Sequence, residues 1–386
     1  MDEKLSRLRL LSSQMSFEPD AEQNGSQPVP DPGVDCKVDS IFVHPAVMPN
    51  GQRIKLLKTL LSSACERDCY YCPFRAGRDL RRATFKPEEF ARLFDSLTRN
   101  RIAEGIFLSS GVIGGGVRTQ DLLLDTADIL RHRLGFRGYI HLKIMPGAER
   151  AQVERAMQLA NRVSINLEAP NTPRLERLAP HKQFLEELLQ PLQWIQEIRR
   201  SEPGYKGWNG RWPSSVTQFV AGGAGESDLE LLSTTQSLYR RLGLTRAYFS
   251  RFKPIEGTPL EHQPPVPALR EHRLYQASFL LRDYGFDLEE LPFEADGRLP
   301  EREDPKQAWA RTHLVEQPLE INHADRSELL RIPGIGPKGV ETILRQRRQG
   351  RIRDLAILRK LGVRVEKAAP YLLLDGRQGA FQPALF

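Results

Sequence analysis

The sequence contains little cysteine and no long apolar run, and these two absences exclude several classes of protein. Only four of the 386 residues are cysteines, too few for a disulfide framework, which favours a reducing compartment. No apolar stretch reaches the length of a membrane-spanning helix, and the N-terminus lacks the apolar core and cleavage site of a signal peptide. We therefore expect a cytoplasmic protein that does not associate with membranes.

Histidine clusters and an even spread of charge are also missing. His44, His141, His181 and His323 form no group with metal-ligand spacing, so we assign them no role.

The formal net charge is +7, but residues 318–386 alone hold 13 Lys and Arg against seven Asp and Glu. Nearly all the positive excess therefore lies in the last fifth of the chain, which suggests contact with a polyanion there.

Three of the four cysteines, in contrast, stand within eight residues. Cys65, Cys69 and Cys72 form the run CERDCYYC. Three thiolates so spaced can bind three irons of a cubane [4Fe–4S] cluster and leave the fourth iron open to a small chelating molecule. A zinc knuckle and three unconnected core thiols are the alternatives. Structural zinc usually takes four N or S ligands, and the only other cysteine, Cys36, lies 29 residues before Cys65.

Strand-like and helix-length segments alternate between residues 54 and 285. The expected strands are residues 54–63, 105–110, 139–144, 162–168, 215–222 and 246–252. The expected helices between them are residues 86–99, 119–134, 148–160, 183–200 and 227–243. Six such βα repeats predict an α/β fold with a parallel sheet, curled into a barrel or partial barrel with helices outside. The three cysteines follow the first strand, at the barrel end where catalytic residues gather.

The segments outside the barrel have a different composition. We expect a flexible N-terminal segment over residues 1–35, a barrel over 36–288, a polar linker over 289–317 and a small all-α domain over 318–386.

A second motif lies in this last domain and resembles a helix-hairpin-helix element. It runs from Arg326 to Val340, and its Gly334, Ile335 and Gly336 form a tight turn that points backbone N–H groups at a phosphate. Lys338 and Arg345 add positive charge. Such contacts address the nucleic-acid backbone and carry no base information. A simple Pro-Gly turn between packed helices is the alternative. Residues 358–365 resemble a second hairpin without its second glycine, and we interpret them as a packing partner.

The cysteine spacing, with Tyr71 just before the last cysteine, resembles the signature of radical S-adenosylmethionine enzymes. This resemblance implies a [4Fe–4S] cluster, S-adenosylmethionine, and a reductase partner such as flavodoxin or ferredoxin. In that family the cluster gives one electron to the sulfonium and releases a 5′-deoxyadenosyl radical.

The same resemblance implies cofactor contacts at the ends of successive strands. The segment Ser109, Ser110 and Gly111 matches the position that meets the methionine amino group, although the family's Gly-Gly-Glu is absent, and a plain Gly-rich turn is the alternative. Asn166 and Glu168 match the ribose contacts, where a helix cap is the alternative. The remaining candidates are Val220, Ala221 and Gly222 near adenine, and Lys143 and Arg251 for a carboxylate or phosphate, unless these two cations are simply exposed.

Longer segments resemble one subgroup, the radical S-adenosylmethionine proteins with a C-terminal helix-hairpin-helix that are associated with DNA modification or repair. The matching pieces include residues 106–112, 135–148, 162–170, 175–182, 217–228, 269–286 and 304–310. The resemblance implies an enzyme that modifies or repairs a base in DNA. An RNA base such as one in tRNA, a small metabolite, and a zinc-stabilised binding module without catalysis remain the alternatives.

Overall fold

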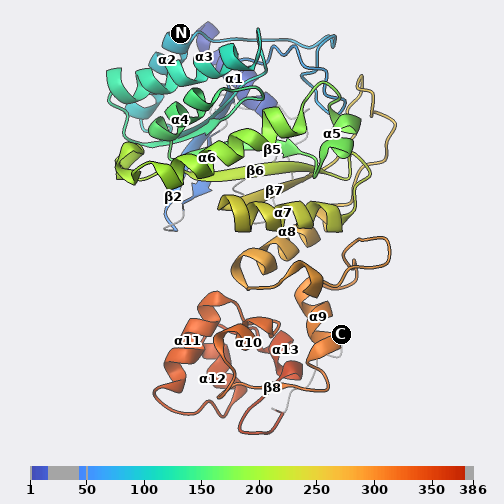
Figure 1. Ribbon diagram of the computed structural model, residues 1–386. Helices are drawn as coiled ribbons and strands as arrows, with labels where there is room; N and C mark the ends of the chain where they lie inside the picture. Colours follow the sequence, from blue (N-terminus) through green and yellow to red (C-terminus); the bar gives the residue numbers. More distant parts are fainter. Residues whose placement is uncertain (1, 16–42, 49–50, 379–386) are drawn as a thin grey trace. The chain divides into compact units, whose positions relative to one another are not determined.

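The computed structural model describes residues 2–15, 43–48 and 51–378 (Figure 1). It divides into two compact units. The first unit comprises residues 1–226 and 238–266, and the second comprises residues 227–237 and 267–386. No helix among the described residues is long and apolar enough to cross a membrane.

The first unit is built on a seven-stranded sheet whose strands lie in chain order. The strands are β1 (Val43–Val47), β2 (Arg53–Leu60), β3 (Gly105–Ser109), β4 (Tyr139–Lys143), β5 (Arg162–Glu168), β6 (Ser214–Ala221) and β7 (Arg246–Arg251). Strand β1 pairs antiparallel with β2, and every later neighbour pairs in parallel. The predicted α/β partial barrel with six parallel strands is therefore confirmed, and the edge strand β1 is an addition that the sequence did not predict.

Helices form the crossovers between the strands, and several of them pack against one another. They are α2 (Pro87–Arg99), α3 (Gly116–Asp128), α4 (Arg150–Leu159), α5 (Thr172–Leu178), α6 (Gln190–Ser201) and α7 (Asp228–Leu242), with π-helical turns η2 (Ile129–Arg133) and η3 (Phe184–Leu189). Helix α2 illustrates the cause, because Phe90, Phe94 and Leu97 recur at helical spacing and are all buried.

The N-terminal residues correct one prediction. Residues Asp2–Gln14 form helix α1, whose Leu8 and Leu11 are fully buried and which packs against β2. The prediction of a flexible segment over residues 1–35 is therefore wrong for this helix, because its leucines, spaced three residues apart, do find a core. Residues 16–35 of that segment, and Cys36, lie outside the described residues.

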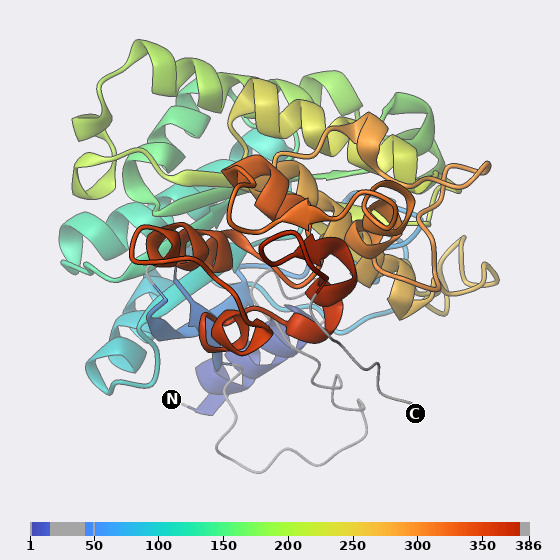
Figure 2. The same cartoon turned by 90° about the horizontal axis from the view of Figure 1, so that it is seen from below.

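The second unit is helical. Its elements are α8 (Ala268–Asp283), η6 (Leu288–Glu290), α9 (Pro305–His313), α10 (Arg326–Arg331), α11 (Pro337–Arg347), α12 (Leu355–Lys360), α13 (Val365–Ala368) and η7 (Ala369–Tyr371). Two short parallel strands, β8 (Leu319–Glu320) and β9 (Leu372–Leu373), join its ends. Figure 2 shows these helices, coloured orange to red, from below.

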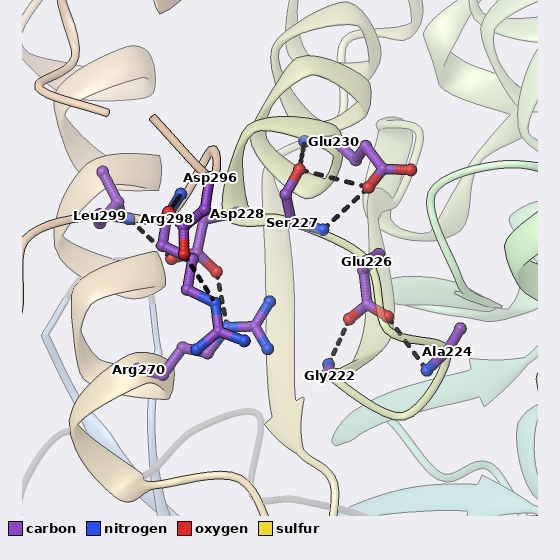
Figure 3. A network of polar contacts seen from close by, with 10 residues as sticks. All are labelled: Gly222, Ala224, Glu226, Ser227, Asp228, Glu230, Arg270, Asp296, Arg298 and Leu299. Carbon is purple, nitrogen blue, oxygen red and sulfur yellow. Dashed lines mark hydrogen bonds and ion pairs between the residues drawn. The ribbon is translucent and has the colours of Figure 1, made fainter. Parts of the chain in front are cut away.

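A buried ion pair joins α8 to the first residue of α7, and residues 227–237 and α8 both belong to the second unit. Asp228, the first residue of α7, accepts a hydrogen bond from Arg270 of α8 at 2.7 Å and from the backbone N–H of Leu299 at 2.9 Å (Figure 3). Both charged side chains are buried. The second unit resumes at residue 267 with α8, whereas the predicted barrel extends to residue 288.

The predicted linker over residues 289–317 is also wrong in part. Asp304 caps a helix that begins at Pro305, and Trp309 and Ala310 of this helix pack on the C-terminal hydrophobic core. The polar and proline-rich composition suggested a linker, but the Asp-Pro pair is a helix start and the residues after it are buried.

Candidate functional site

The cysteine run lies directly after β2, at the carboxyl end of the parallel sheet. It has no regular secondary structure, and Cys69 is buried while Cys65 and Cys72 are half-buried. The N–H of Cys72 donates to the carbonyl of Cys69 at 3.2 Å, which makes a turn between these two residues. All three thiols are free of disulfides.

The end of β3 is held against this cysteine loop. The N–H of Gly111 donates to the carbonyl of Ser62 at 2.7 Å, and the N–H of Glu66 donates to the carbonyl of Val112 at 2.9 Å. A Cβ atom at position 111 would lie 2.1 Å from the carbonyl oxygen of Ala64, so only glycine fits here. The structure thus brings the predicted segment 109–111 alongside Cys65.

Glu66 adds a contact that the sequence did not predict. Its two carboxylate oxygens accept the N–H groups of Gly114 and Gly115, each at 2.9 Å. Both glycines have positive φ, 65° and 91°, a region that glycine enters at little cost. The only sequence signal was an acidic residue next to Cys65 and a run of three glycines.

The segment from the end of α5 into η3 holds the other side of the cysteine loop. The N–H of Tyr70 donates to the carbonyl of Leu178, and Arg67 donates to the carbonyl of His181, both at 2.7 Å. Arg67 also pairs with Glu187 at 2.5 Å. The cysteine loop is therefore fixed from β3 on one side and from residues 178–187 on the other.

Glu168 occupies a strained position at the end of β5. Its φ is +64°, in the left-handed region that side chains other than glycine rarely adopt, and the register between β5 and β6 shifts between Asn166 and Glu168. One carboxylate oxygen accepts a hydrogen bond from Lys182 at 3.2 Å. The other oxygen, Oε2, is buried and has no hydrogen bond of ordinary geometry among the described residues, although the Tyr71 hydroxyl interacts with the same carboxylate. A buried oxygen of this kind fits a donor supplied by a bound molecule.

The charges around Cys69 interact strongly. Burial raises the pKa of the Cys69 thiol, and nearby Lys182 opposes that rise. Burial also raises the pKa of Cys72, with Cys69 beside it acting in the same direction, and burial followed by Glu168 raises the pKa of Tyr71. Burial opposes the charge on Lys182, but Cys69 and Glu168 outweigh it, so the pKa of Lys182 is raised. Thiolates at this site therefore need a positive partner.

An iron–sulfur cluster fits this donor set. Iron supplies positive charge that stabilises thiolates, and three cysteines on one loop match the number of ligands required. The described part of the chain contains no group of three His, Cys, Asp or Glu side chains that could hold a single metal ion. In a cubane each thiolate binds a separate iron, so the sulfurs need not converge on one point.

Polar residues within the strands line one face of the sheet. Lys143 donates to Asn166 at 2.5 Å, and His141 lies 2.9 Å from the hydroxyl of Ser164. Burial, followed by nearby cations such as Arg162, lowers the pKa of His141 well below its usual range. A small cavity here is lined by Phe107, His141, Lys143, Ser164, Asn166, Val216, Thr217, Gln218 and Tyr248. The structure thus pairs two predicted residues and adds His141, Gln218 and Tyr248.

The backbone groups that follow β6 form hydrogen bonds with other residues of the chain. The N–H groups of Gly222 and Ala224 donate to the buried carboxylate of Glu226 (Figure 3), and Gln263 donates to the carbonyl of Gly222 at 3.1 Å. Val220 and Ala221 are buried, and Arg251, the last residue of β7, is half-buried opposite Ala221. Both backbone groups of Gly222 therefore already have partners within the chain.

The second predicted site lies in the second unit, where α10 and α11 flank a turn over residues 332–336, hereafter the 332–336 turn. Gly334 has a φ of +82°, and Gly336 is the N-cap of α11. Ile335 is buried and its N–H donates to the carbonyl of Ile332 at 3.2 Å, so neither its side chain nor its N–H is available for binding. Lys338 and Arg345 are exposed on α11.

The segment around Arg364 packs against the 332–336 turn. The N–H of Arg364 donates to the carbonyl of Gly334 at 3.1 Å, and a Cβ at 334 would lie 2.4 Å from the carbonyl oxygen of Arg364. Leu358, Val363 and Val365 are buried in the core of the unit, which confirms the predicted packing role of residues 358–365. Arg347 differs from Arg345, because it donates to the carbonyl of Ala324 at 2.6 Å and so has a structural partner.

Comparison with known proteins bears on the first unit. Residues 59–234 match the family described as the Radical SAM superfamily. No curated protein matches the chain.

Several solved structures are similar at low identity. The [FeFe]-hydrogenase maturase HydG from Carboxydothermus hydrogenoformans is 17% identical with a TM-score of 0.46, over 59% of this chain and 51% of HydG. Methylornithine synthase (PylB) is 16% identical with a TM-score of 0.46, over 60% of this chain and 63% of PylB. A radical SAM methyltransferase from Sphaerobacter thermophilus is 18% identical with a TM-score of 0.43, over 60% of this chain and 68% of the methyltransferase.

The chain spans about half the length of HydG, so the activity of that protein is no guide to this one. The cysteine run follows the first parallel strand, inside the matched residues. Proteins of the matched superfamily use a [4Fe–4S] cluster and S-adenosylmethionine. Residues 59–234, a little under half of the chain, are thus similar to a radical SAM superfamily domain.

Proposed function

We propose that the chain is a radical S-adenosylmethionine enzyme that modifies or repairs a base in DNA. Cys65, Cys69 and Cys72 are the cluster ligands in this proposal. When bound, the cluster and S-adenosylmethionine supply a 5′-deoxyadenosyl radical that abstracts hydrogen from the substrate. A flavodoxin or ferredoxin delivers the electron, as radical SAM enzymes require such a reducing partner.

The residues around the cysteine loop have separate roles. Segment 109–111, held against the loop by the Gly111 hydrogen bond, meets the methionine amino group of the cofactor. Oε2 of Glu168 accepts a ribose hydroxyl, since it is a buried acceptor at the end of β5 without a hydrogen bond of ordinary geometry among the described residues. Lys143, Asn166, Arg251 and residues 220–222 complete the walls of the cofactor site.

The nucleic-acid part of the proposal rests on one observation. Residues 326–347 form two helices joined by a short turn, and they lie within the most basic part of the chain. The turn and the N-terminus of α11 offer backbone N–H groups to a phosphate, and Lys338 and Arg345 stand exposed on the same helix. We interpret this element as a helix-hairpin-helix that grips the DNA backbone.

The target base must leave the helix stack before it can react. A carbon radical abstracts hydrogen only from an atom in contact with it, and a stacked base cannot enter the end of a barrel. The substrate is therefore single-stranded, damaged or flipped out of the duplex.

An RNA base is the second candidate, because contacts to the phosphate backbone are common to both polymers. The test is anaerobic reconstitution with iron and sulfide, followed by incubation with S-adenosylmethionine, a reductant, and DNA or RNA. We expect 5′-deoxyadenosine and a mass-shifted nucleoside from the DNA digest; a shifted nucleoside from RNA alone would replace the proposal by the second candidate.

Two variants make this test specific. Replacing Cys65, Cys69 and Cys72 together by Ala should abolish both the brown colour and cofactor cleavage. The single variant Cys36→Ala is the matched control and should keep both. Cleavage by the triple variant, or zinc in place of iron in the native protein, would contradict the assignment.

A further inference from the structure

Residues 304–310 (DPKQAWA) have no part in the function proposed so far. Asp304 accepts the N–H of Gln307 at 2.9 Å and so caps α9, which begins at Pro305. Lys306, the second residue of this helix, is buried. A buried lysine is rare unless its ammonium has a specific partner, so its contacts define its role.

The ammonium of Lys306 contacts the 332–336 turn from inside the second unit. Its Nζ atom donates to the carbonyl of Ile335 at 2.6 Å, and lies 4.6 Å from the centre of the Tyr284 ring. The Tyr284 hydroxyl lies against the same turn, because a Cβ at Gly336 would be 3.2 Å from it. Lys306 and Tyr284 thus form the inner support of the turn.

The hydrogen bond to Ile335 fixes the direction of the next N–H group. No cis peptide bond occurs among the described residues, so the peptide between Ile335 and Gly336 is trans. In a trans peptide the C=O and the N–H point in opposite directions. Because the C=O points to Lys306, the N–H of Gly336 points away from it, beside the start of α11.

We propose that Lys306 is a positioning residue for the nucleic-acid backbone: it holds the Ile335–Gly336 peptide so that the N–H of Gly336 faces a bound phosphate. The inference rests on the proposed phosphate-binding role of the 332–336 turn. Lys306 also places a positive charge behind that turn. Since the charge is buried, salt screens its attraction for an anion less than that of a surface lysine.

The groups facing Lys306 make its charge sensitive to pH. Burial lowers the pKa of Lys306 to about 7, while Asp304 on the same helix raises it and Arg331 of α10 lowers it. The Tyr284 ring completes the surroundings. A phosphate on the far side of the turn favours the protonated form of Lys306. Binding should therefore take up a proton and weaken as the pH rises from 6 to 8.

The experiment measures binding of a fluorescein-labelled DNA duplex by anisotropy over a KCl series at pH 6 and pH 8. The variants are Lys306→Met and Lys306→Arg. The control is Arg311→Met, which removes one exposed charge from the same helix, where Arg311 pairs with Glu303 at 2.9 Å. Thermal unfolding verifies that each variant is folded, and hydrogen exchange of residues 332–340 reports on the turn itself.

We expect Lys306→Met to weaken binding at pH 6 by about tenfold and to speed exchange at the turn. Lys306→Arg should keep the affinity and lose the difference between pH 6 and pH 8, because arginine stays protonated. Arg311→Met should behave as the native protein does. Native binding without any effect of Lys306→Met on affinity or exchange would overturn the inference, and so would a pH dependence that persists in Lys306→Arg. Failure of the native protein to bind the DNA duplex would instead remove the proposed function, and the inference with it.

Discussion

The Nζ atom of Lys182 lies 3.2 Å from Oε1 of Glu168; the Glu168 side chain is buried, and the Lys182 side chain is only 10% exposed. This pair couples the end of β5 to residues 178–187, which hold the cysteine loop. Removal of one member of a buried ion pair leaves the other charge uncompensated.

Lys182→Met should therefore lower the free energy of unfolding by about 3–5 kcal/mol. Urea unfolding of the anaerobic protein measures the loss. Lys206→Met, which breaks the surface pair with Glu202, is the matched control and should cost less than about 1 kcal/mol. Adding Glu168→Gln to Lys182→Met should restore part of the stability. Equal stability of the two lysine variants would show that the buried pair is not coupled as the structure implies.

Glu66→Gln should weaken the junction between the cysteine loop and the glycines after β3. A glutamine has one acceptor oxygen, and its NH₂ group would face the other of the two N–H donors, at Gly114 or Gly115. Because Glu66 and Gly114 are exposed, water can bind the freed N–H group, and the cost should be about 0.5–1.5 kcal/mol. We expect less iron per chain after reconstitution and a lower melting temperature. Glu176→Gln, on the exposed face of α5, is the control. Full iron content in Glu66→Gln would contradict this role.

His141 should make the protein sensitive to mild acid. Its pKa in the folded protein lies well below the ordinary value of 6.5, because burial opposes its charge. The unfolded chain therefore binds the extra proton first as the pH falls through about 6.5, and stability is lost below that pH at up to ~1.4 kcal/mol per unit. Above pH 7 the effect should vanish.

Thermal unfolding between pH 5 and pH 7.5 measures this slope. His141→Asn should be less stable overall but should flatten the slope over this range. His262→Asn should leave the slope unchanged, because the His262 side chain is 94% exposed. An unaltered slope in His141→Asn would exclude His141 as its source.

Lys338→Glu combined with Arg345→Glu should weaken nucleic-acid binding and flatten its salt dependence by about one unit of slope for each lost phosphate contact. Cleavage of S-adenosylmethionine should survive, because the three cysteines lie in the other unit. The control is Arg137→Glu with Arg302→Glu, which changes two exposed residues by the same total charge. Cofactor cleavage that fails together with binding would refute the separation of the two activities.

The sequence predicted the parallel strands to within a few residues, because each combines β-branched or aromatic residues with a following amphipathic helix. It missed α1, whose leucines at 8 and 11 carry the right spacing but precede a long polar stretch. It also missed α9, since Asp304 and Pro305 begin a helix but suggested a linker within so polar a segment. Short helices that depend on a distant core carry little local signal.

Only those site residues that stand close together in the sequence could be predicted. Cys65, Cys69 and Cys72 stand together, so their spacing alone indicated a cluster. The contacts of Glu66 with Gly114 and Gly115 span 48 and 49 residues, and they involve backbone groups that no motif records. Lys182 meets Glu168 only because a helix end returns to the strand. Such contacts follow from the tertiary fold and not from local pattern.

The close approach of Gly334 to Arg364 limits how this chain can change. The two peptide segments touch backbone to backbone, so neither can lengthen without displacing the other. Exposed loops usually accept extra residues at small cost. Here an insertion in either segment would demand a compensating change about thirty positions away. Insertions and deletions in the two segments should therefore occur together in related sequences.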